Sequence, residues 1–185
     1  MKKLSTYLFL LLFSFSATSF ADDIQDFQIE GMSIGDSLLD YFSEEKIKSN
    51  SRKFGKKYYT FEIEESNELK QYDSLMVGYE NNDEKYIVAI LGGTSFKQIN
   101  KCHKEMDKII LELSNLFEKK FDKKTTHKHS DPTKANVKIT SAELYFDNYD
   151  KVLIGCVEQK EKSHTLDISL RKKKFTDYIN NEAYK

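Results

Sequence analysis

Short polar connections between strand-like segments are the feature that most restricts what this chain can fold into. Within the segments, apolar residues alternate with polar ones or, in one case, run together as in a central strand. The segments are KKYYTFEIEE, DSLMVGYE, YIVAILGG, VKITSAELYF, KVLIGCVEQ and HTLDISLRKKKF. The connections ENNDEK, DNYDK and QKEKS are rich in turn-forming residues and too short to contain a crossover helix. They therefore predict hairpins and a mostly antiparallel sheet.

A long helix is predicted between the third and fourth segments, from Ser95 to about Phe121. Its apolar residues recur at spacings of three and four, which places them on one face of the helix. They are Ile99, Cys102, Met106, Ile109, Ile110, Leu113, Leu116 and Phe117. Ser95 and Gln98 have the spacing of a capping box, directly after Gly92-Gly93, where we expect a tight turn.

A short helix is predicted near the N-terminus, with Ser33 as its N-cap and Asp36 as the acid of a capping box. Its apolar face would consist of Leu38, Leu39 and Phe42. The resulting element order is helix, three strands, helix, three strands, or αβββ-αβββ. We expect one α+β domain over residues 22–185, with a mostly antiparallel sheet, one short N-terminal helix and one long central helix. The charges from Arg171 to Lys174 favour an exposed edge strand at its end.

This element order resembles the helix-then-meander units of small lipoproteins of outer-membrane assembly and of secreted β-lactamase inhibitors. The stretch IEGMSIGDSLLDYFSEE also resembles small exported bacterial proteins that carry no assigned activity. The first resemblance implies an antiparallel sheet and the second implies export. Neither implies a reaction, because fold does not determine function.

The first 21 residues have the three parts of a secretory signal peptide. Lys2 and Lys3 precede an apolar core from Leu4 to Phe15, and Ser19-Phe20-Ala21 forms a cleavage pattern. This leader is too short for a stable membrane span. The two cysteines, Cys102 and Cys156, would then reach an oxidising compartment, and we expect them to form one disulfide. The predicted location is periplasmic or secreted.

Charge excludes a typical nucleic-acid binder, since 29 basic residues nearly balance 30 acidic ones. The distribution is uneven along the chain. Residues 22–45 carry eight carboxylates and no Lys or Arg, whereas residues 119–134 carry six lysines and two acids. Such an asymmetry can dock a partner or form two solvated surfaces.

The residues Gly35-Asp36-Ser37-Leu38 resemble the signature of the GDSL lipases and esterases. That resemblance implies a nucleophilic Ser37 at the end of a strand in a parallel α/β fold. The family's Gly-x-Asn-Asp block has only Glu80-Asn81-Asn82-Asp83 as a counterpart. Its Asp-x-x-His pair is missing too, because no histidine here has Asp three residues before it. Without a base a serine is a weak nucleophile, so the same residues better predict a helix start.

Other candidate sites are incomplete. His127, His129 and Asp131 could surround a metal, but they lie in a lysine-rich segment with no fourth ligand nearby. His103 and His164 are interpreted as surface positions. Leu91-Gly92-Gly93-Thr94-Ser95 lacks the remaining residues of a phosphate-binding loop. The adjacent acids Glu44-Glu45 and Glu64-Glu65 have no feature of an acid/base pair.

We therefore expect an exported, non-catalytic module that binds a protein or an envelope component. No cofactor, metal or nucleic acid is implied, and no membrane span is expected after signal removal. Two alternatives stay open. One is a serine esterase that uses Ser37, and the other is a small-ligand binder with an aromatic cleft between sheet and helix, drawing on the chain's 11 tyrosines.

Overall fold

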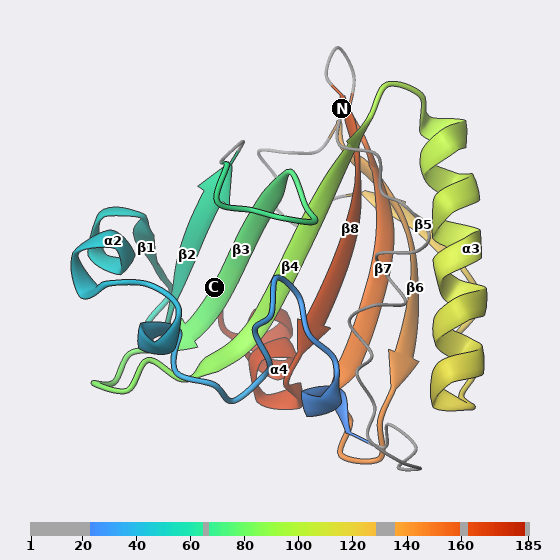
Figure 1. The fold of residues 1–185 in the computed structure, drawn as a ribbon. Helices are drawn as coiled ribbons and strands as arrows, with labels where there is room; N and C mark the ends of the chain where they lie inside the picture. Colours follow the sequence, from blue (N-terminus) through green and yellow to red (C-terminus); the bar gives the residue numbers. More distant parts are fainter. Residues whose placement is uncertain (1–22, 65–66, 129–135, 160–162, 184–185) are drawn as a thin grey trace.

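The computed structural model describes residues 23–64, 67–128, 136–159 and 163–183, and the predicted signal peptide lies outside them. They form one α+β unit with a single eight-stranded antiparallel sheet (Figure 1). The strands are β1 (Ser51–Phe54), β2 (Tyr58–Glu64), β3 (Ser74–Glu80), β4 (Ile87–Phe96), β5 (Thr125–Lys128), β6 (Lys138–Tyr145), β7 (Lys151–Glu158) and β8 (His164–Arg171). The helices are the 3₁₀ turns η1 (Ile24–Asp26) and η2 (Leu38–Asp40), and the α-helices α2 (Glu44–Ser49), α3 (Ile99–Phe117) and α4 (Lys173–Asn181).

The sheet consists of two four-stranded meanders joined along β4 and β8. Its spatial order is β1-β2-β3-β4-β8-β7-β6-β5, and every neighbouring pair is antiparallel. The predicted antiparallel sheet is confirmed. Each half, however, has four strands rather than the predicted three. The additional strands are β1 and β5, whose sequences SRKF and TTHK lack the alternation that would have identified them.

Helix α3 packs across one face of the sheet, against β7, β8 and β4 (Figure 1). Its predicted apolar stripe is confirmed by five buried residues: Cys102, Met106, Ile109, Leu113 and Phe117. The predicted start at Ser95 is wrong, because that residue belongs to β4 and pairs with Thr165. The helix begins at Ile99, and its N-cap Gln98 makes no side-chain cap bond.

The expected turn at Gly92-Gly93 is also wrong, since both glycines lie inside β4. They are required for close packing rather than for a turn. A Cβ on Gly92 would collide with the ring of Tyr72, and one on Gly93 would collide with the side chain of Ser74. The lack of side chains therefore lets neighbouring groups approach the strand from both faces.

The predicted edge strand from Arg171 to Lys174 is wrong in two respects. Strand β8 lies between β4 and β7, at the centre of the sheet. The chain then leaves the sheet and forms α4, whose first N–H group, that of Lys173, donates to Asp150 Oδ1 at 2.8 Å. Phe175 and Tyr178, three residues apart, are buried against the sheet, and this helical spacing was obscured by the lysine run.

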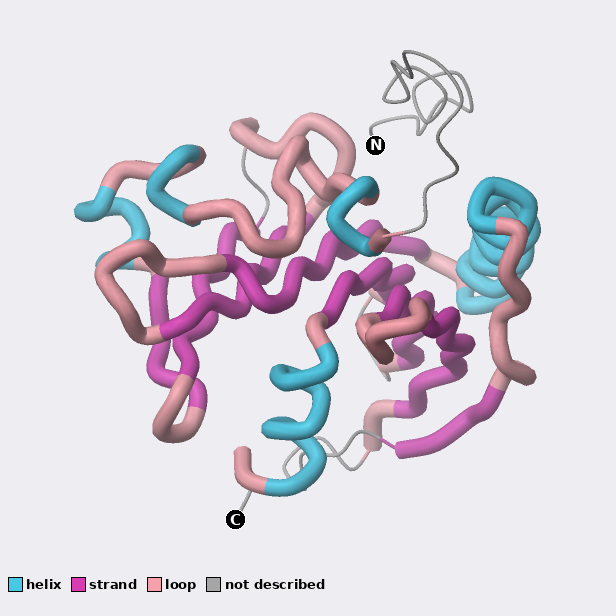
Figure 2. The backbone as a smooth tube through the Cα atoms, turned by 90° about the horizontal axis from the view of Figure 1, so that it is seen from below, coloured by secondary structure: helices cyan, strands magenta, loops and turns pink. Residues whose placement is uncertain are grey.

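The N-terminal segment forms turns where a helix was predicted. The Asp36 carboxylate does accept the N–H of Ser33 at 2.8 Å, as in a capping box, but Gly35 has φ +97° and the chain turns. The α-helical residues come later, in α2, with Ser43 as the N-cap. Figure 2 shows this segment and α3 on one side of the sheet and α4 on the other. We call the side with α3 the covered face and the opposite side the open face.

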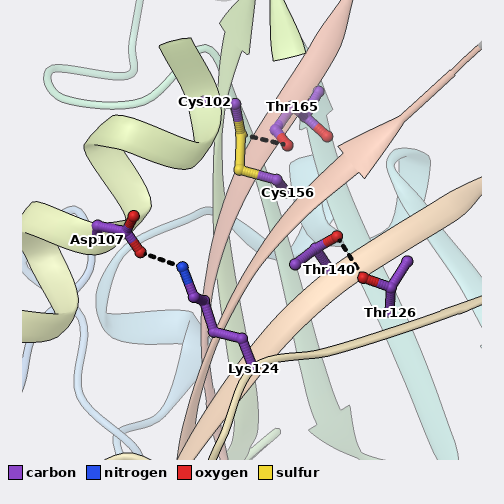
Figure 3. The surroundings of a disulfide bond; sticks show 7 residues. All are labelled: Cys102, Asp107, Lys124, Thr126, Thr140, Cys156 and Thr165. Carbon is purple, nitrogen blue, oxygen red and sulfur yellow. Dashed lines mark hydrogen bonds and ion pairs between the residues drawn. A yellow bond between two sulfur atoms is a disulfide. The ribbon is translucent and has the colours of Figure 1, made fainter. Parts of the chain in front are cut away.

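The predicted disulfide between Cys102 and Cys156 is present and joins α3 to β7 (Figure 3). The two Cα atoms are 6.0 Å apart, and the bridge spans 54 positions of sequence. Cys102 Sγ lies 3.4 Å from the carbonyl oxygen of Thr165. A disulfide sulfur carries no proton, so this approach is a contact rather than a hydrogen bond.

Candidate functional site

Ser37, the candidate nucleophile, is part of a turn fixed by the main chain. Its hydroxyl donates to the carbonyl of Glu84 at 2.6 Å and accepts the N–H of Leu39, so it caps η2. Ser37 also forms an antiparallel bridge with Tyr86. Asp36, which precedes it, accepts from Ser33 and from the hydroxyl of Tyr41. The GDSL residues are thus engaged in holding the N-terminal segment against the start of β4.

Among the described residues, no hydrogen bond joins a histidine to Ser37, whose hydroxyl is bonded to the main chain instead. His127 lies on the exposed strand β5, while His129 and Asp131 fall outside the described residues. In the described part of the chain, no three His, Cys, Asp or Glu side chains are arranged to hold a metal. His103 and His164 are half-buried, and each has one buried ring nitrogen without a hydrogen-bond partner among the described residues. Their interpretation as ordinary surface positions is therefore wrong.

The predicted acidic and basic segments and the paired acids contain both exposed side chains and side chains in ion pairs. Glu44 and Glu45 lie exposed in the first turn of α2, and Glu64 is exposed at the end of β2, while Glu65 is outside the described residues. In the basic segment, ion pairs join Lys119 to Asp147 and Lys124 to Asp107. The second of these pairs is drawn in Figure 3.

The covered face of the sheet, where an aromatic cleft was expected under α3, is packed with the main hydrophobic core formed by the sheet, α3 and the N-terminal segment. Aliphatic and aromatic side chains from both layers are buried there. They include Phe61, Val77, Ile90, Met106, Leu113, Ile154 and Ile168. A small ligand would therefore have to use another surface.

The open face is the part of the sheet that the described elements leave least covered. Helix α4 packs on it at one end, where Phe175 and Tyr178 meet Tyr58 and Ala89. In antiparallel pairs, residues in register point to the same face, so the register identifies the side chains of the open face away from α4.

One row of small residues crosses the open face from β3 to β6. The register pairs Ser74 with Gly93, Gly93 with Asp167, Asp167 with Gly155, and Gly155 with Ser141. We call these five residues the transverse row. Asp167 occupies its centre and has a glycine beside it on each neighbouring strand.

Burial strongly perturbs the Asp167 carboxyl. Desolvation raises its pKa from the ordinary 3.8 to about 6, although a hydrogen bond from Thr165 and the charge of Arg171 act in the opposite direction. A Cβ on Gly93 would lie 3.2 Å from Asp167 Oδ1, which shows how closely the carboxyl approaches that strand. Such a shift is typical of functional sites but also occurs in structural networks.

A second group of charges lies further along the same face. The Lys151 ammonium, on a side chain that is almost fully buried, pairs with Glu143 at 2.8 Å, and Tyr145 also donates to Glu143. Burial raises the pKa of Glu143, but these two hydrogen bonds and the nearby positive charges more than offset it, so the pKa lies below its ordinary value. The same carboxylate and burial raise the pKa of Tyr145 to about 12.

Half-buried apolar side chains flank the transverse row on both sides. On the side toward α4 they are Met76, Leu91 and Leu153, which share a register row with the buried Ser169. On the other side they are Val157 and Ile139, in register with Thr165. The face thus combines aliphatic walls with a polar centre, the usual composition of a ligand site.

Sequence reasoning missed this arrangement, although one signal was present. The alternation of Leu166, Ile168 and Leu170 already implies that Asp167 points away from the core. Nothing in the sequence, however, shows that β8 lies between β4 and β7, so the flanking glycines could not be assigned to it.

No protein-family model, curated protein or solved structure matches this chain. Within the described residues, no helix is long and apolar enough to span a membrane.

Proposed function

We propose that this chain is an exported binding module that takes a protein or an envelope component on its open face. One observation carries the proposal: half-buried aliphatic side chains flank a partly buried polar row on a face that has only α4 against it among the described elements. A solvated sheet face ordinarily carries polar residues, and exposed apolar groups around a polar centre are characteristic of binding surfaces.

The disulfide supports the periplasmic or secreted location, because such bonds persist in oxidising compartments. The contacts of Ser37 favour binding over hydrolysis. Both hydrogen-bonding roles of its hydroxyl are occupied by the main chain, whereas a nucleophile needs a hydrogen bond to a positioned base.

The experiment is a thermal-shift screen of the mature chain, residues 22–185, against envelope glycans, lipids and candidate envelope proteins. Ligands that raise the melting temperature are then retested on two matched variants. Leu153→Glu places a charge on the open face, and Leu111→Glu places the same charge on α3, where the leucine is 62% exposed.

The expected result is a ligand whose stabilisation is lost in Leu153→Glu and kept in Leu111→Glu. Equal stabilisation of both variants would show that the ligand binds elsewhere and would contradict the proposal. A screen without any stabilising ligand would also count against it.

A further inference from the structure

We propose that the outer edge of β1 binds an extended, acidic segment of a partner protein by strand addition, in which the segment becomes the next strand of the sheet. This surface is the edge of the sheet and not its open face. The inference therefore goes beyond the proposed function and does not depend on it. The main-chain groups of β1 select a peptide, and the positive charges around them select an acidic one.

Strand β1 is the first strand of the sheet and pairs only with β2 (Figure 1). The direction of its main-chain groups follows from a hydrogen bond at the start of this pair, in which the N–H of Glu62 donates to the carbonyl of Asn50 at 3.1 Å. The next pair, Ser51 with Phe61, is then one without direct hydrogen bonds, and the two kinds of pair alternate along the strand. The main-chain groups of Ser51 and Lys53 therefore point away from β2.

These outward groups are available for pairing. Neither the N–H nor the carbonyl group of Ser51 or Lys53 makes a hydrogen bond among the described residues. The side chains of Arg52 and Lys53 are exposed, so the centre of the edge is open to solvent. Two donors and two acceptors at alternate positions are the pattern that an added strand completes, as peptides do at the sheet edges of recognition domains.

The sequence around β1 is uniformly basic. Residues 46–61, KIKSNSRKFGKKYYTF, contain six Lys or Arg residues and no Asp or Glu. Acids from other elements pair with three of these cations. The pairs are Lys46 with Glu68, Arg52 with Glu62, and Lys57 with Glu182.

Three lysines remain for a ligand: Lys48, Lys53 and Lys56. All three are exposed, and none makes an ion pair with another described residue. Lys53 lies on β1 itself, while Lys48 precedes the strand and Lys56 follows it. An acidic strand would therefore meet positive charge from one end of β1 to the other, which favours its association and fixes its register.

The side chains of β1 alternate between the two faces of the sheet, and this alternation specifies the partner further. Phe54 lies on the open-face side, where its ring centroid is 5.8 Å from that of Phe175 on α4. Arg52 shares that side, and Lys53 lies on the other. Two consecutive acidic residues in the added strand would thus place one carboxylate beside Arg52 and the next beside Lys53.

The same charges argue against a second copy of this chain as the occupant. Antiparallel pairing of two β1 strands about a two-fold axis would bring Arg52 opposite Arg52, or Lys53 opposite Lys53. Like charges directly opposite each other destabilise a sheet, and lysine on an edge strand commonly prevents such self-pairing. An acidic strand turns the same side chains into favourable partners.

The test is an NMR titration of the mature chain, residues 22–185, with two five-residue peptides. One is acetyl-Val-Glu-Glu-Val-Thr-amide, and the other has Gln in place of both Glu residues. We expect the acidic peptide to bind at least about fivefold more tightly at low salt, because two ion pairs add to the main-chain bonds. It should also slow the solvent exchange of the Ser51 and Lys53 amide protons, which binding through side chains alone would not do.

Two substitutions at one position separate charge from main-chain pairing. Lys53→Ala removes the charge and keeps the N–H, whereas Lys53→Pro removes both. Because this N–H points away from β2, the proline leaves the bonds between β1 and β2 in place, as prolines do on edge strands. Lys53→Ala should weaken binding of the acidic peptide about twofold to fourfold, and Lys53→Pro at least about fivefold more. The amide protons of Tyr58 and Thr60, which bond to β1, check that the strand stays paired.

Equal affinity of the two peptides for wild type would show that charge does not select the partner. Equal affinity of the two Lys53 variants for the acidic peptide, or an unchanged exchange rate of the Ser51 amide with peptide bound, would show that strand addition is wrong.

Vesicles of phosphatidylglycerol are the final comparison, because basic residues also attract anionic lipid. We expect the acidic peptide to bind and the vesicles not to compete with it at physiological salt. Binding of the vesicles without binding of the peptide would overturn the inference in favour of a membrane surface. Either failure leaves the open-face proposal intact, since Leu153→Glu tests a different surface.

Discussion

Three backbone N–H groups in the loop between β2 and β3 donate to one carboxylate, that of Glu30. Its oxygens accept from Lys70, Gln71 and Tyr72 at 2.9, 2.7 and 2.9 Å. Glu30 itself has φ +53°, a left-handed conformation that is uncommon for a non-glycine residue. At the scale of single residues, carboxylates thus fix loops that the hairpin pattern leaves undefined.

Replacing Glu30 with Ala should lower the free energy of unfolding by about 2–3 kcal/mol, because three donors lose a charged acceptor. Glu30→Gln should cost about half as much, since the amide keeps one acceptor oxygen. The exposed Glu45→Ala is the control and should stay within about 0.5 kcal/mol of wild type. Urea unfolding measures all three, and equal stability of Glu30→Ala and the control would refute the role of the carboxylate.

Asp167 predicts an unusual pH dependence of stability. Its pKa is higher in the folded chain than in the unfolded chain, so the folded state binds more protons between about pH 4 and 6. Stability should therefore rise as the pH falls through 6, and this gain ends near the unfolded value of 3.8. Glu143 acts in the opposite direction at lower pH, because its folded pKa is depressed and its contribution is lost on acidification.

Between pH 7 and pH 5, wild type should gain about 1 kcal/mol relative to Asp167→Asn. Comparing the two proteins cancels the contributions of all other ionisable groups, because both proteins contain them. Urea unfolding at the two pH values measures the difference. The same change in both proteins would mean that Asp167 has an ordinary pKa.

At the scale of elements, the segments with a strong apolar periodicity were predicted correctly, and the short elements were missed. The buried stripe of α3 and six strands follow directly from apolar spacing. Strands β1 and β5 have too few apolar residues for a pattern, and they exist because neighbouring strands offer pairing partners. In the same way α4 depends on a distant cap, Asp150, and on the aromatic surface that it covers.

The turn between β1 and β2 is fixed by its contact with α4. Gly55 has φ +63°, and a Cβ there would collide with the hydroxyl of Tyr178, which accepts the N–H of Lys56 at 2.7 Å. Gly31 has a similar conformation, φ +83°, but no atom lies within 4 Å of its Cβ position. Substituting alanine at Gly31 therefore introduces backbone strain alone, whereas the same substitution at Gly55 introduces backbone strain and a steric collision.

Gly31→Ala should cost about 1 kcal/mol, the price of a left-handed alanine, and Gly55→Ala should cost at least about 1–2 kcal/mol more. Adding Tyr178→Phe to Gly55→Ala should recover part of the difference, because it removes the colliding oxygen. Thermal unfolding of the four proteins provides the comparison. Equal losses in the two single glycine variants would show that α4 does not press on this turn.

At the scale of the whole molecule, the disulfide joins the two layers. The Cys102→Ser/Cys156→Ser variant should lose about 4 kcal/mol of stability in the chain-entropy model for a bridge of this length. Denaturant unfolding of the variant and of the oxidised wild type gives this difference. If wild type reacted with a thiol reagent before reduction, the bond would be absent and the comparison would lose its basis.

The candidate site could not be predicted from the sequence, for a physical reason. The transverse row takes one residue from each of five strands, and it depends on the pairing of β4 with β8, whose residues are about 75 positions apart. Hairpin patterns predict pairing only between strands that are consecutive in the sequence. The signature that was visible in the sequence, at Gly35 to Leu38, instead describes a structural turn.

The central claim, that the open face is the binding surface, can be tested most directly by photo-crosslinking in cells that produce the protein. A photoreactive phenylalanine analogue is placed at Leu153, on the open face, or at Leu111, on α3, as the matched control. We predict a discrete adduct from position 153 that is absent from position 111. An adduct from position 111 alone, or none from position 153, would contradict the account.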